Sequence, residues 1–575
     1  MPEQRQDDRP QADDGAPTDL VDLVVAAAAD APQRAALVAD GSTMTWAELD
    51  EEVGRVAHGL ASAGVVAGHR VALAMANRPE MVVGYLAVLR VQAVAVPLNP
   101  RATADELTRM LADSGARMVV ADQVAVAAVR TAVAALGAAV TGAAGSTDAG
   151  SSGAGSSGDA GATPAAGVAL PAELVARAVV PRVVTVGTTL QPGERSWDQL
   201  RADTTRDHPQ LPDPEKLAVL LYTSGASGRP RAAMLSHRAL LANIEQAGRV
   251  EPAMIRSDDV VLGALPLFHV YGLNAVLGAV LWHRATLVLV ETYEPESVLD
   301  LVAAQQVTVL PLAPTVIGHL LGRDRLAERL ASVRLVLSGS APLDTEQVEE
   351  FVALTDIAVH QGYGLTEAAP IVTSTLCVPP GEDGEVGRPE PGSVGSALPG
   401  IEVRLVDDRG LAPEQGDPGE VSIRGANLFS GYWPDGGEAP DEDGWWTTGD
   451  VGFLAADGQL FLVDRLKELV IVSGFNVYPS EVEDVVGEVP GVTEVAVIGV
   501  PDPDTGEAVV AYVVAPGQEP ADVVAAVDAA CGARLARFKQ PTRVEVVEEL
   551  PHTVTGKVRK GSLRAAERRR NLELL

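Results

Sequence analysis

Short apolar segments alternate with amphipathic helical segments along most of this chain, and no other feature constrains its fold as strongly. Thr45 and Glu48 have the spacing of a capping box, which starts a helix that Gly64 ends. A strand, a helix and a strand then follow at 70–76, 79–90 and 93–98. This order is typical of parallel sheets covered by helices, so the sequence predicts an α/β fold.

The same alternation continues far into the chain and then changes. Further buried-strand candidates lie at 117–122, 218–225, 286–291, 307–310 and 334–339. Because 575 residues exceed what one hydrophobic core normally supports, we predict a large α/β domain of several subdomains over residues 19–463. Smaller alternating units after residue 463 predict a compact α+β domain over residues 464–575.

Two segments have compositions that do not support a packed core. Residues 1–18 are polar and acidic and lack the pattern of a secretory signal, so we expect a disordered lead-in. Residues 137–167 are rich in Gly, Ala and Ser, which predicts a disordered surface insertion. Because the strand and helix pattern resumes on both sides, the insertion is expected to lie within the large domain.

Charge and cysteine content exclude several classes of partner. Asp and Glu outnumber Lys and Arg by 78 to 44, and the net charge of −34 disfavours sequence-independent binding to nucleic acid or anionic membranes. No apolar run reaches about 18 residues, so no membrane span is predicted. Cys377 and Cys531 lack metal-site spacing, and we expect two free thiols in a cytoplasmic protein.

The segment YTSGASGRPRAAMLSH at 222–237 directly follows an apolar strand. Its hydroxyl groups, and backbone N–H groups that glycine leaves accessible, can converge on a phosphate. The candidate contacts are Thr223, Ser224, Gly225, Ala226, Ser227, Gly228 and Arg231. The spacing G-x-x-x-x-G-K-[ST] is absent, so this is not a P-loop of the large NTPase class. Taken alone, the segment more often indicates a plain Gly/Ser turn.

Three further segments accompany it. They are QGYGLTEAAP at 361–370, WWTTGDVGFLAADGQLFLVDRLKELVIVSGFNVYPSEVE at 445–483, and LPHTVTGKVRK at 550–560. With these motifs in this order, the chain resembles the acyl-adenylate-forming (AMP-binding) enzyme superfamily over essentially residues 20–565. The resemblance is closest to fatty-acyl-CoA synthetases and enzymes like 4-coumarate-CoA ligase. It implies a large N-terminal α/β domain followed by a small, mobile α+β domain.

The resemblance also implies which residues hold ATP. SGSAP at 338–342 matches the adenine loop, Tyr363 offers a flat face to adenine, and Asp450 can accept both ribose hydroxyls. Thr366 can donate to a phosphate, and Glu367 supplies a hard oxygen suited to Mg²⁺. The expected nucleotide contacts are Gly339, Ser340, Ala341, Pro342, Gln361, Gly362, Tyr363, Gly364, Asp450, Arg465 and Lys467.

Residues of the small domain match the family's catalytic and hinge positions. An ammonium at Lys557 would offset the repulsion between a carboxylate and the α-phosphate, so we expect it to be catalytic, with an exposed structural lysine as the alternative. Asp464 matches the hinge about which the small domain rotates between half-reactions. After that rotation, Ser473 and Gly474 would line the entry for the pantetheine arm of coenzyme A.

PLFHVYGLN at 266–274 resembles the acyl-pocket segment of fatty-acyl and coumaroyl ligases. His269 is expected to border the reacting carboxylate and to take part in catalysis. Tyr271 and Gly272 are expected to line the substrate pocket with it. The alternative is a core histidine beside packed aromatic residues.

The phosphate loop departs from the family pattern T-S-G-T-T-G-x-P-K-G. Ala226 replaces a threonine, Arg231 a lysine and Ala232 a glycine. Because Arg and Lys are not interchangeable near phosphate, we expect weaker ATP binding or a different hold on pyrophosphate. Glu367 and Lys557 are retained, so an active enzyme is still predicted.

Together these resemblances imply an acyl-CoA ligase that uses ATP, Mg²⁺ and coenzyme A. It would form acyl-AMP and pyrophosphate from a carboxylic acid, and then the thioester. The segments GYGLTEAAP and PLFHVYGL resemble those of medium- and long-chain fatty-acyl ligases most. They therefore favour a medium- or long-chain fatty acid, with an aryl acid as the next candidate. An acyl-AMP ligase that loads a carrier protein, and a nucleotide-binding module without catalytic activity, are also compatible with these motifs.

Overall fold

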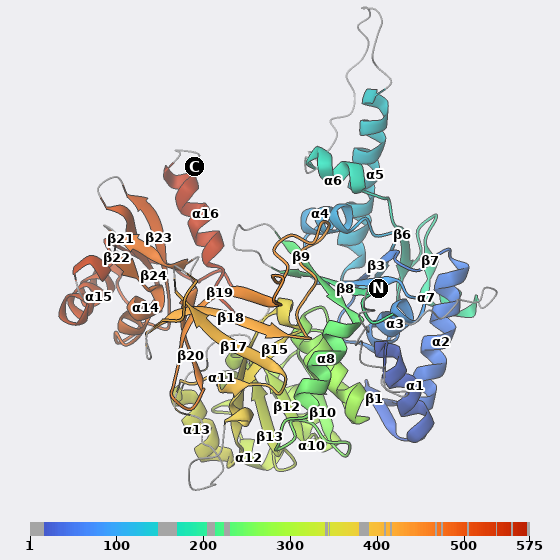
Figure 1. The fold of residues 1–575 in the computed structure, drawn as a ribbon, viewed down its shortest axis with the longest axis horizontal. Coiled ribbons are helices and arrows are strands. Elements are labelled where there is room, and N and C mark those ends of the chain that lie inside the picture. Colours follow the sequence, from blue (N-terminus) through green and yellow to red (C-terminus); the bar gives the residue numbers. More distant parts are fainter. Residues whose placement is uncertain are drawn as a thin grey trace, which may run out of the picture.

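The computed structural model has a mixed α/β fold with a large N-terminal domain and a small C-terminal domain, which confirms the predicted fold class (Figure 1). The described residues are 17–147, 170–203, 213–223, 230–339, 343, 345–378, 390, 392–407, 410–413, 417–465, 468–472, 475–502, 505–535, 537–553 and 556–571. Both free cysteines lie in this part, Cys531 buried and Cys377 half-buried.

The first sheet of the large domain has the strand order β7-β6-β5-β3-β4-β8-β9. Its strands are β3 (Arg70–Ala74), β4 (Val94–Leu98), β5 (Met118–Ala121), β6 (Arg182–Thr185), β7 (Arg195–Ser196), β8 (Leu217–Thr223) and β9 (Arg231–Ser236). Helix α3 (Pro79–Arg90) connects β3 to β4 with the predicted bounds. All strand pairs are parallel except β8 with β9, so the predicted phosphate loop joins two antiparallel strands.

The second sheet has the order β16-β15-β14-β13-β12-β10-β11-β1-β2. Its strands are β1 (Ala35–Ala39), β2 (Ser42–Thr45), β10 (Val260–Gly263), β11 (Thr286–Leu289), β12 (Val309–Leu312), β13 (Leu335–Ser338), β14 (Val359–Gly364), β15 (Ile371–Ser374) and β16 (Ser396–Ala397). Strands β10, β12, β13 and β14 are parallel, so their carboxyl ends meet at one edge. Three predicted site segments begin at that edge, after β10, after β13 and at the end of β14.

Helix α2 (Trp46–Ser62) shows how the sequence sets the local structure. Thr45 caps it in a capping box with Glu48, as predicted, and Trp46 at its first position is fully buried. The apolar face of α2 packs against α3 in the main core of the large domain. The position of the first sheet therefore depends on the helix pattern that is visible in the sequence.

A third sheet and the small domain complete the fold. The third sheet contains β17 (Ile401–Val406), β18 (Gly419–Gly425), β19 (Trp445–Leu454) and β20 (Leu460–Arg465). The small-domain sheet contains β21 (Val470–Val472), β22 (Phe475–Val477), β23 (Glu494–Asp502), β24 (Gly506–Val514) and β25 (Arg543–Val546), with helices α14 (Pro479–Gly487), α15 (Pro520–Arg534) and α16 (Lys560–Asn571). The sheet changes after β20, and a domain boundary at residue 464 stays a prediction.

The predicted disordered insertion at 137–167 is wrong at its start. Helix α5 (Val126–Thr147) continues through the first part of that segment, because alanine is the strongest helix former and outweighs the scattered glycines. Residues 148–169, and residues 1–16 of the lead-in, lie outside the described part of the chain. Among the described residues, no helix is long and apolar enough to cross a membrane.

Candidate active site

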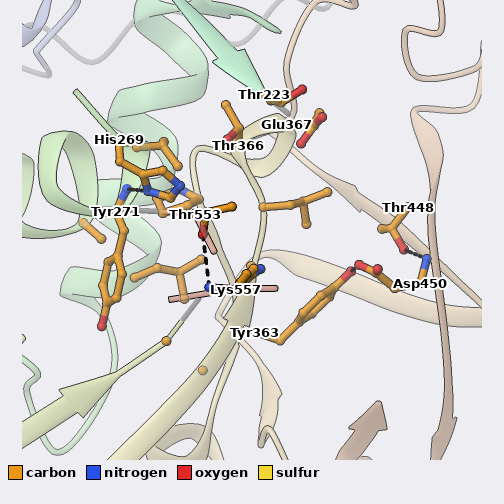
Figure 2. A pocket seen from close by; sticks show the side chains of 18 of the residues that line it. Thr223, His269, Tyr271, Tyr363, Thr366, Glu367, Thr448, Asp450, Thr553 and Lys557 are labelled. Carbon is orange, nitrogen blue, oxygen red and sulfur yellow. Dashed lines mark hydrogen bonds between the residues drawn. The ribbon is translucent and has the colours of Figure 1, made fainter. Parts of the chain in front are cut away.

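A cavity of about 1830 Å³ lies where the edges of the sheets meet the small domain. Predicted residues from six separate segments line it: Thr223, Arg231, His269, Tyr271, Gly339, Gln361, Gly362, Tyr363, Gly364, Thr366, Glu367, Asp450 and Lys557. Figure 2 shows Lys557 between His269 and Tyr271 on one side and Tyr363 and Asp450 on the other. The fold thus brings together residues that are more than 300 positions apart in the sequence.

Tyr363 and Asp450 form a buried pair at the expected ribose position. The Tyr363 hydroxyl donates to Asp450 Oδ2 at 2.6 Å, and each residue is 8% exposed. The Asp450 N–H donates to Thr448 Oγ1 at 3.1 Å, and Gly449 between them has φ of +78°. A carboxylate has several lone pairs, so Asp450 can still accept from ribose hydroxyls while Tyr363 fixes its orientation.

Glu367 is held at both its backbone and its side chain. Its carbonyl oxygen accepts from the Phe429 N–H at 2.9 Å, and its carboxylate accepts from the Tyr432 hydroxyl. Glu367 is 8% exposed and Tyr432 is 9% exposed. A buried carboxylate with a fixed partner is a preformed anionic group that faces the cavity.

Buried asparagine side chains hold the loop that follows Glu367. Asn427 Nδ2 donates to Ala368 O, and Asn274 Nδ2 donates to Ala369 O, each at 2.7 Å. Asn243 exchanges two hydrogen bonds with the backbone of Ile371. These contacts join helices and loops from distant parts of the large domain to the segment after Glu367.

The donor set at Glu367 fits a magnesium ion that is bound mainly by phosphate and water. In the described part of the chain, no group of three or more His, Cys, Asp or Glu side chains could hold a metal ion. Magnesium commonly takes only one or two protein carboxylates beside substrate phosphates. Glu367 would therefore act as a single carboxylate ligand, with Thr366 and Thr223 beside it (Figure 2).

His269 and Tyr271 follow β10 on a turn that an asparagine fixes. Asn77 donates to Leu265 O at 2.8 Å and accepts from the Leu267 N–H at 2.9 Å. Burial, and then the positive charge of Lys557, lower the pKa of His269 to about 4. The imidazole is therefore neutral at physiological pH, and its Nδ1 accepts from the Tyr271 N–H at 3.4 Å.

Gly272 lies where the chain folds back on itself, and its place in the substrate pocket stays a prediction. A Cβ atom at this position would lie 2.4 Å from the Pro266 carbonyl oxygen. The glycine is needed because the chain approaches itself closely just after His269.

Lys557 enters the cavity on a short turn of the small domain. The Thr553 N–H donates to Lys557 O at 2.7 Å, and the Lys557 N–H donates to Thr553 Oγ1 at 3.1 Å. Gly556 has φ of +83°, and a Cβ there would lie 2.9 Å from Thr315 of helix α11 (Pro314–Leu320). The turn is thus docked against the large domain with Lys557 near His269.

One end of the cavity is apolar. Its lining comes from the end of α8 (His237–Gly248), the segment after it, and the helices η1 (Tyr271–Gly278) and α9 (Ala279–His283). The lining residues there are Ala247, Gly248, Met254, Ile255, Ala275, Val276, Ala279 and His283. None carries a fixed charge, and burial lowers the pKa of His283.

The remaining predicted residues are only partly placed. Asp464 and Arg465 lie in β20, where their backbones pair with Val451 and Asp450 of β19. The predicted residues Ser224, Gly225, Ala226, Ser227, Gly228, Ser340, Ala341, Pro342, Lys467, Ser473 and Gly474 lie outside the described part of the chain.

Sequence reasoning missed the residues that hold the site in place. These are Tyr432, Asn77, Asn243, Asn274, Asn427 and Thr315. The run GYWPDGG at 431–437 does indicate a turn, since it is rich in Gly and Pro. It gave no signal of a contact with Glu367.

Comparison with known proteins identifies the family. The family model "AMP-binding enzyme" matches residues 24–433, and the model "AMP-binding enzyme C-terminal domain" matches residues 481–557. Long-chain-fatty-acid-CoA ligase from Escherichia coli O157:H7 is 33% identical and covers 95% of this chain and 93% of its own. 4-Coumarate-CoA ligase 5 from Oryza sativa subsp. japonica is also 33% identical, over 95% and 94%.

A solved structure agrees with these relatives. ATP-bound MatB from Rhodopseudomonas palustris has a TM-score of 0.77 and 31% identity, and covers 96% of this chain and 99% of its own. Likeness over the whole length of both chains means that the two domains, and not the large domain alone, are shared.

Proposed function

Because the chain belongs to the AMP-binding enzyme family and is an acid-thiol ligase, we propose that it activates a medium- or long-chain fatty acid and transfers the acyl group to coenzyme A. One relative is named for long-chain fatty acids and another for 4-coumarate, and each is 33% identical to this chain. Sequence similarity alone therefore does not choose between these substrates. We expect the reaction to occur in the cytoplasm, because ATP and coenzyme A are soluble substrates.

The apolar end of the cavity is the observation that supports a fatty acid as the substrate. Ala247, Gly248, Ala275 and Ala279 have small side chains, which leave room for an alkyl chain. Burial of each methylene of such a chain contributes about 0.8 kcal/mol. Among the described residues that line this end, none is a Lys or Arg that could pair with the second carboxylate of a dicarboxylic acid.

In the first half-reaction, a carboxylate oxygen of the acid attacks the α-phosphorus of ATP and pyrophosphate leaves. Lys557 would reach both reacting groups and offset their mutual repulsion, which grows toward the transition state. Asp450, fixed by Tyr363, would bind the ribose. Magnesium, when bound at Glu367, supplies charge neutralisation for the polyphosphate. Neutral His269 would border the acyl carboxylate without adding a charge.

In the second half-reaction, the coenzyme A thiol attacks the acyl carbonyl of acyl-AMP, and AMP leaves. The small domain would rotate about Asp464, which removes Lys557 from the cavity and brings the segment of Ser473 and Gly474 to the thiol entry. The docked turn at Gly556 corresponds to the pose for the first half-reaction.

A second candidate is a nucleotide-binding module without catalytic activity, which the altered phosphate loop suggested. Arg231 is ordered in this structure by Glu438, with Nη1 to Oε1 at 2.9 Å, and Lys557 reaches the cavity. These two described cationic residues at the nucleotide end of the cavity favour an active enzyme.

The test is pyrophosphate release with a panel of fatty and aryl acids, with and without coenzyme A. We expect turnover with medium- or long-chain fatty acids, and thioester formation only when coenzyme A is present. A preference for aryl acids would show that the protein is an aryl-acid ligase instead. Transfer of the acyl group to a carrier protein but not to coenzyme A would identify a carrier-loading ligase. If the protein binds ATP but releases no pyrophosphate with any acid, it is a nucleotide-binding module without catalytic activity.

A further inference from the structure

The turn at residues 431–438 touches two predicted site residues at once, although no motif in the sequence marked it. Its backbone lies alongside β9, the strand that follows the phosphate loop. The Trp433 N–H donates to Ala232 O at 2.9 Å, and Gly431 O accepts from the Met234 N–H at 3.0 Å. The turn is therefore fixed to the phosphate-binding part of the large domain.

Tyr432 extends from this turn between an anionic and a cationic side chain. Its hydroxyl donates to the Glu367 carboxylate, and the Arg231 guanidinium lies over its ring at 3.7 Å from the centroid. Arg231 also pairs with Glu438 at the far end of the same turn. Tyr432 thus links the residue at the end of the phosphate loop to the candidate metal ligand.

The contact between Tyr432 and Glu367 is buried, since Tyr432 is 9% exposed and Glu367 is 8% exposed. A hydrogen bond to a charged acceptor is about twice as strong as one between neutral groups.

We propose that Tyr432 is a positioning residue, which orients the Glu367 carboxylate for the cation of Mg·ATP, and that Arg231 holds Tyr432 from its other face. This inference rests on the proposed function. A partner that orients a metal ligand commonly changes metal affinity about 10- to 100-fold when it is removed. Tyr432 would act through Glu367 and need not touch ATP.

The same arrangement accounts for the arginine at position 231, where the family pattern has lysine. A guanidinium is planar, so it can stack on the Tyr432 ring and pair with the Glu438 carboxylate at the same time. A lysine ammonium would keep the charge but lose the stacked geometry. The substitution at 231 and the Tyr432 contact are therefore parts of one structure.

The experiment measures ATP binding by calorimetry without acid substrate, once with Mg²⁺ and once with EDTA. We expect Tyr432→Phe to weaken ATP binding about tenfold with Mg²⁺ and to leave binding in EDTA unchanged. Glu367→Gln should lose all of the ATP affinity that depends on Mg²⁺. The double variant should bind ATP no more weakly than Glu367→Gln does.

Tyr512→Phe is the matched control, because Tyr512 donates to Glu567 in the small domain, away from the cavity. It should bind ATP as the wild type does. Arg231→Lys tests the other face of Tyr432, with an expected loss of about threefold that again needs Mg²⁺. Its result remains informative if Tyr432→Phe does not fold.

Two outcomes would overturn the proposal: a wild-type affinity in Tyr432→Phe, or an equal loss with Mg²⁺ and with EDTA, which indicates a structural role. Failure of the proposed function is distinguishable, since the wild type would then release no pyrophosphate with fatty acids, whereas the effect of Tyr432→Phe is read from ATP binding without acid. If only Arg231→Lys can be purified, an unchanged Mg²⁺ dependence in that variant overturns the proposal.

Discussion

The two domains contribute to the site in physically different ways. On the large domain, Tyr363, Glu367 and Asp450 are buried and hydrogen-bond to side chains from other segments. On the small domain, Lys557 is exposed and lies on a turn whose hydrogen bonds are local, to Thr553. The candidate nucleotide-binding half is thus built before the substrate arrives, whereas we propose that docking of the small domain delivers Lys557.

This difference follows from what each half must do. Buried polar groups have to be paired, and the pairing orders the large-domain residues in the geometry that binds ATP. A lysine that serves only one half-reaction has to leave the cavity, so it cannot be held by the same kind of buried contact. Substitutions in the large domain should therefore change different kinetic parameters from substitutions in the small domain.

Removal of the lysine should have the largest effect and should act on one half-reaction. We expect Lys557→Ala to slow adenylation about 100- to 1000-fold, because one group that stabilises developing charge is lost. Transfer from supplied acyl-AMP to coenzyme A should be almost unchanged. Separate rapid-mixing assays of the two steps check this. Equal losses in both steps would show that Lys557 is not confined to the adenylation pose.

Substitutions among the buried residues of the large domain should instead weaken nucleotide binding. Asp450→Ala removes the expected ribose acceptor and leaves the buried Tyr363 hydroxyl without its partner. A hydrogen bond to a charged group is worth about 1.5–3 kcal/mol, so KM for ATP should rise about 10- to 100-fold. Asp300→Ala, at a solvent-exposed position, is the control. An unchanged KM would remove Asp450 from the nucleotide site.

The buried amides should matter for stability more than for chemistry. Asn274→Ala removes the side-chain donor to the Ala369 carbonyl oxygen, at a cost of about 1–3 kcal/mol for one buried unpaired group, whereas the Leu240 carbonyl keeps its hydrogen bond within helix α8. We expect a lower unfolding midpoint in urea, with Gln191→Ala as the exposed control. If stability is retained and only KM for ATP rises, the amide acts on the loop after Glu367 and not on the domain.

Elements that depend on neighbouring residues could be predicted from the sequence. The capping box at Thr45 and the bounds of α3 follow from local periodicity, and the structure confirms both. The predicted start of the insertion is wrong because the helix propensity of alanine extends α5 to Thr147, in spite of a composition typical of disorder. Local signals conflict there, and the structure shows which one dominates.

The candidate site was predicted only where a motif marks it. Tyr432 and Glu367 are 65 positions apart, and Asn274 meets Ala369 across 95 positions, so no local pattern connects either pair. A buried asparagine also has the same composition signal as an exposed one. Contacts of this kind depend on how the sheets pack, and they became visible only in the folded chain.

The smallest expected effect is a change in the titration of His269, which reports whether the lysine is docked. After burial, the charge of Lys557 is the second cause of the low pKa of His269, about 4. In Lys557→Ala that pKa should rise toward its ordinary value of 6.5, and NMR of the imidazole measures it.

The sign of the linked stability change is fixed by the same shift. The folded protein binds fewer protons at His269 than the unfolded chain between about pH 4 and 6.5, so His269 makes stability rise with pH across that window. His269→Gln should flatten this rise, which urea unfolding at several pH values measures. A pKa that is unaffected by Lys557→Ala would mean that the undocked pose dominates in solution, and that the catalytic half assembles only when substrate is bound.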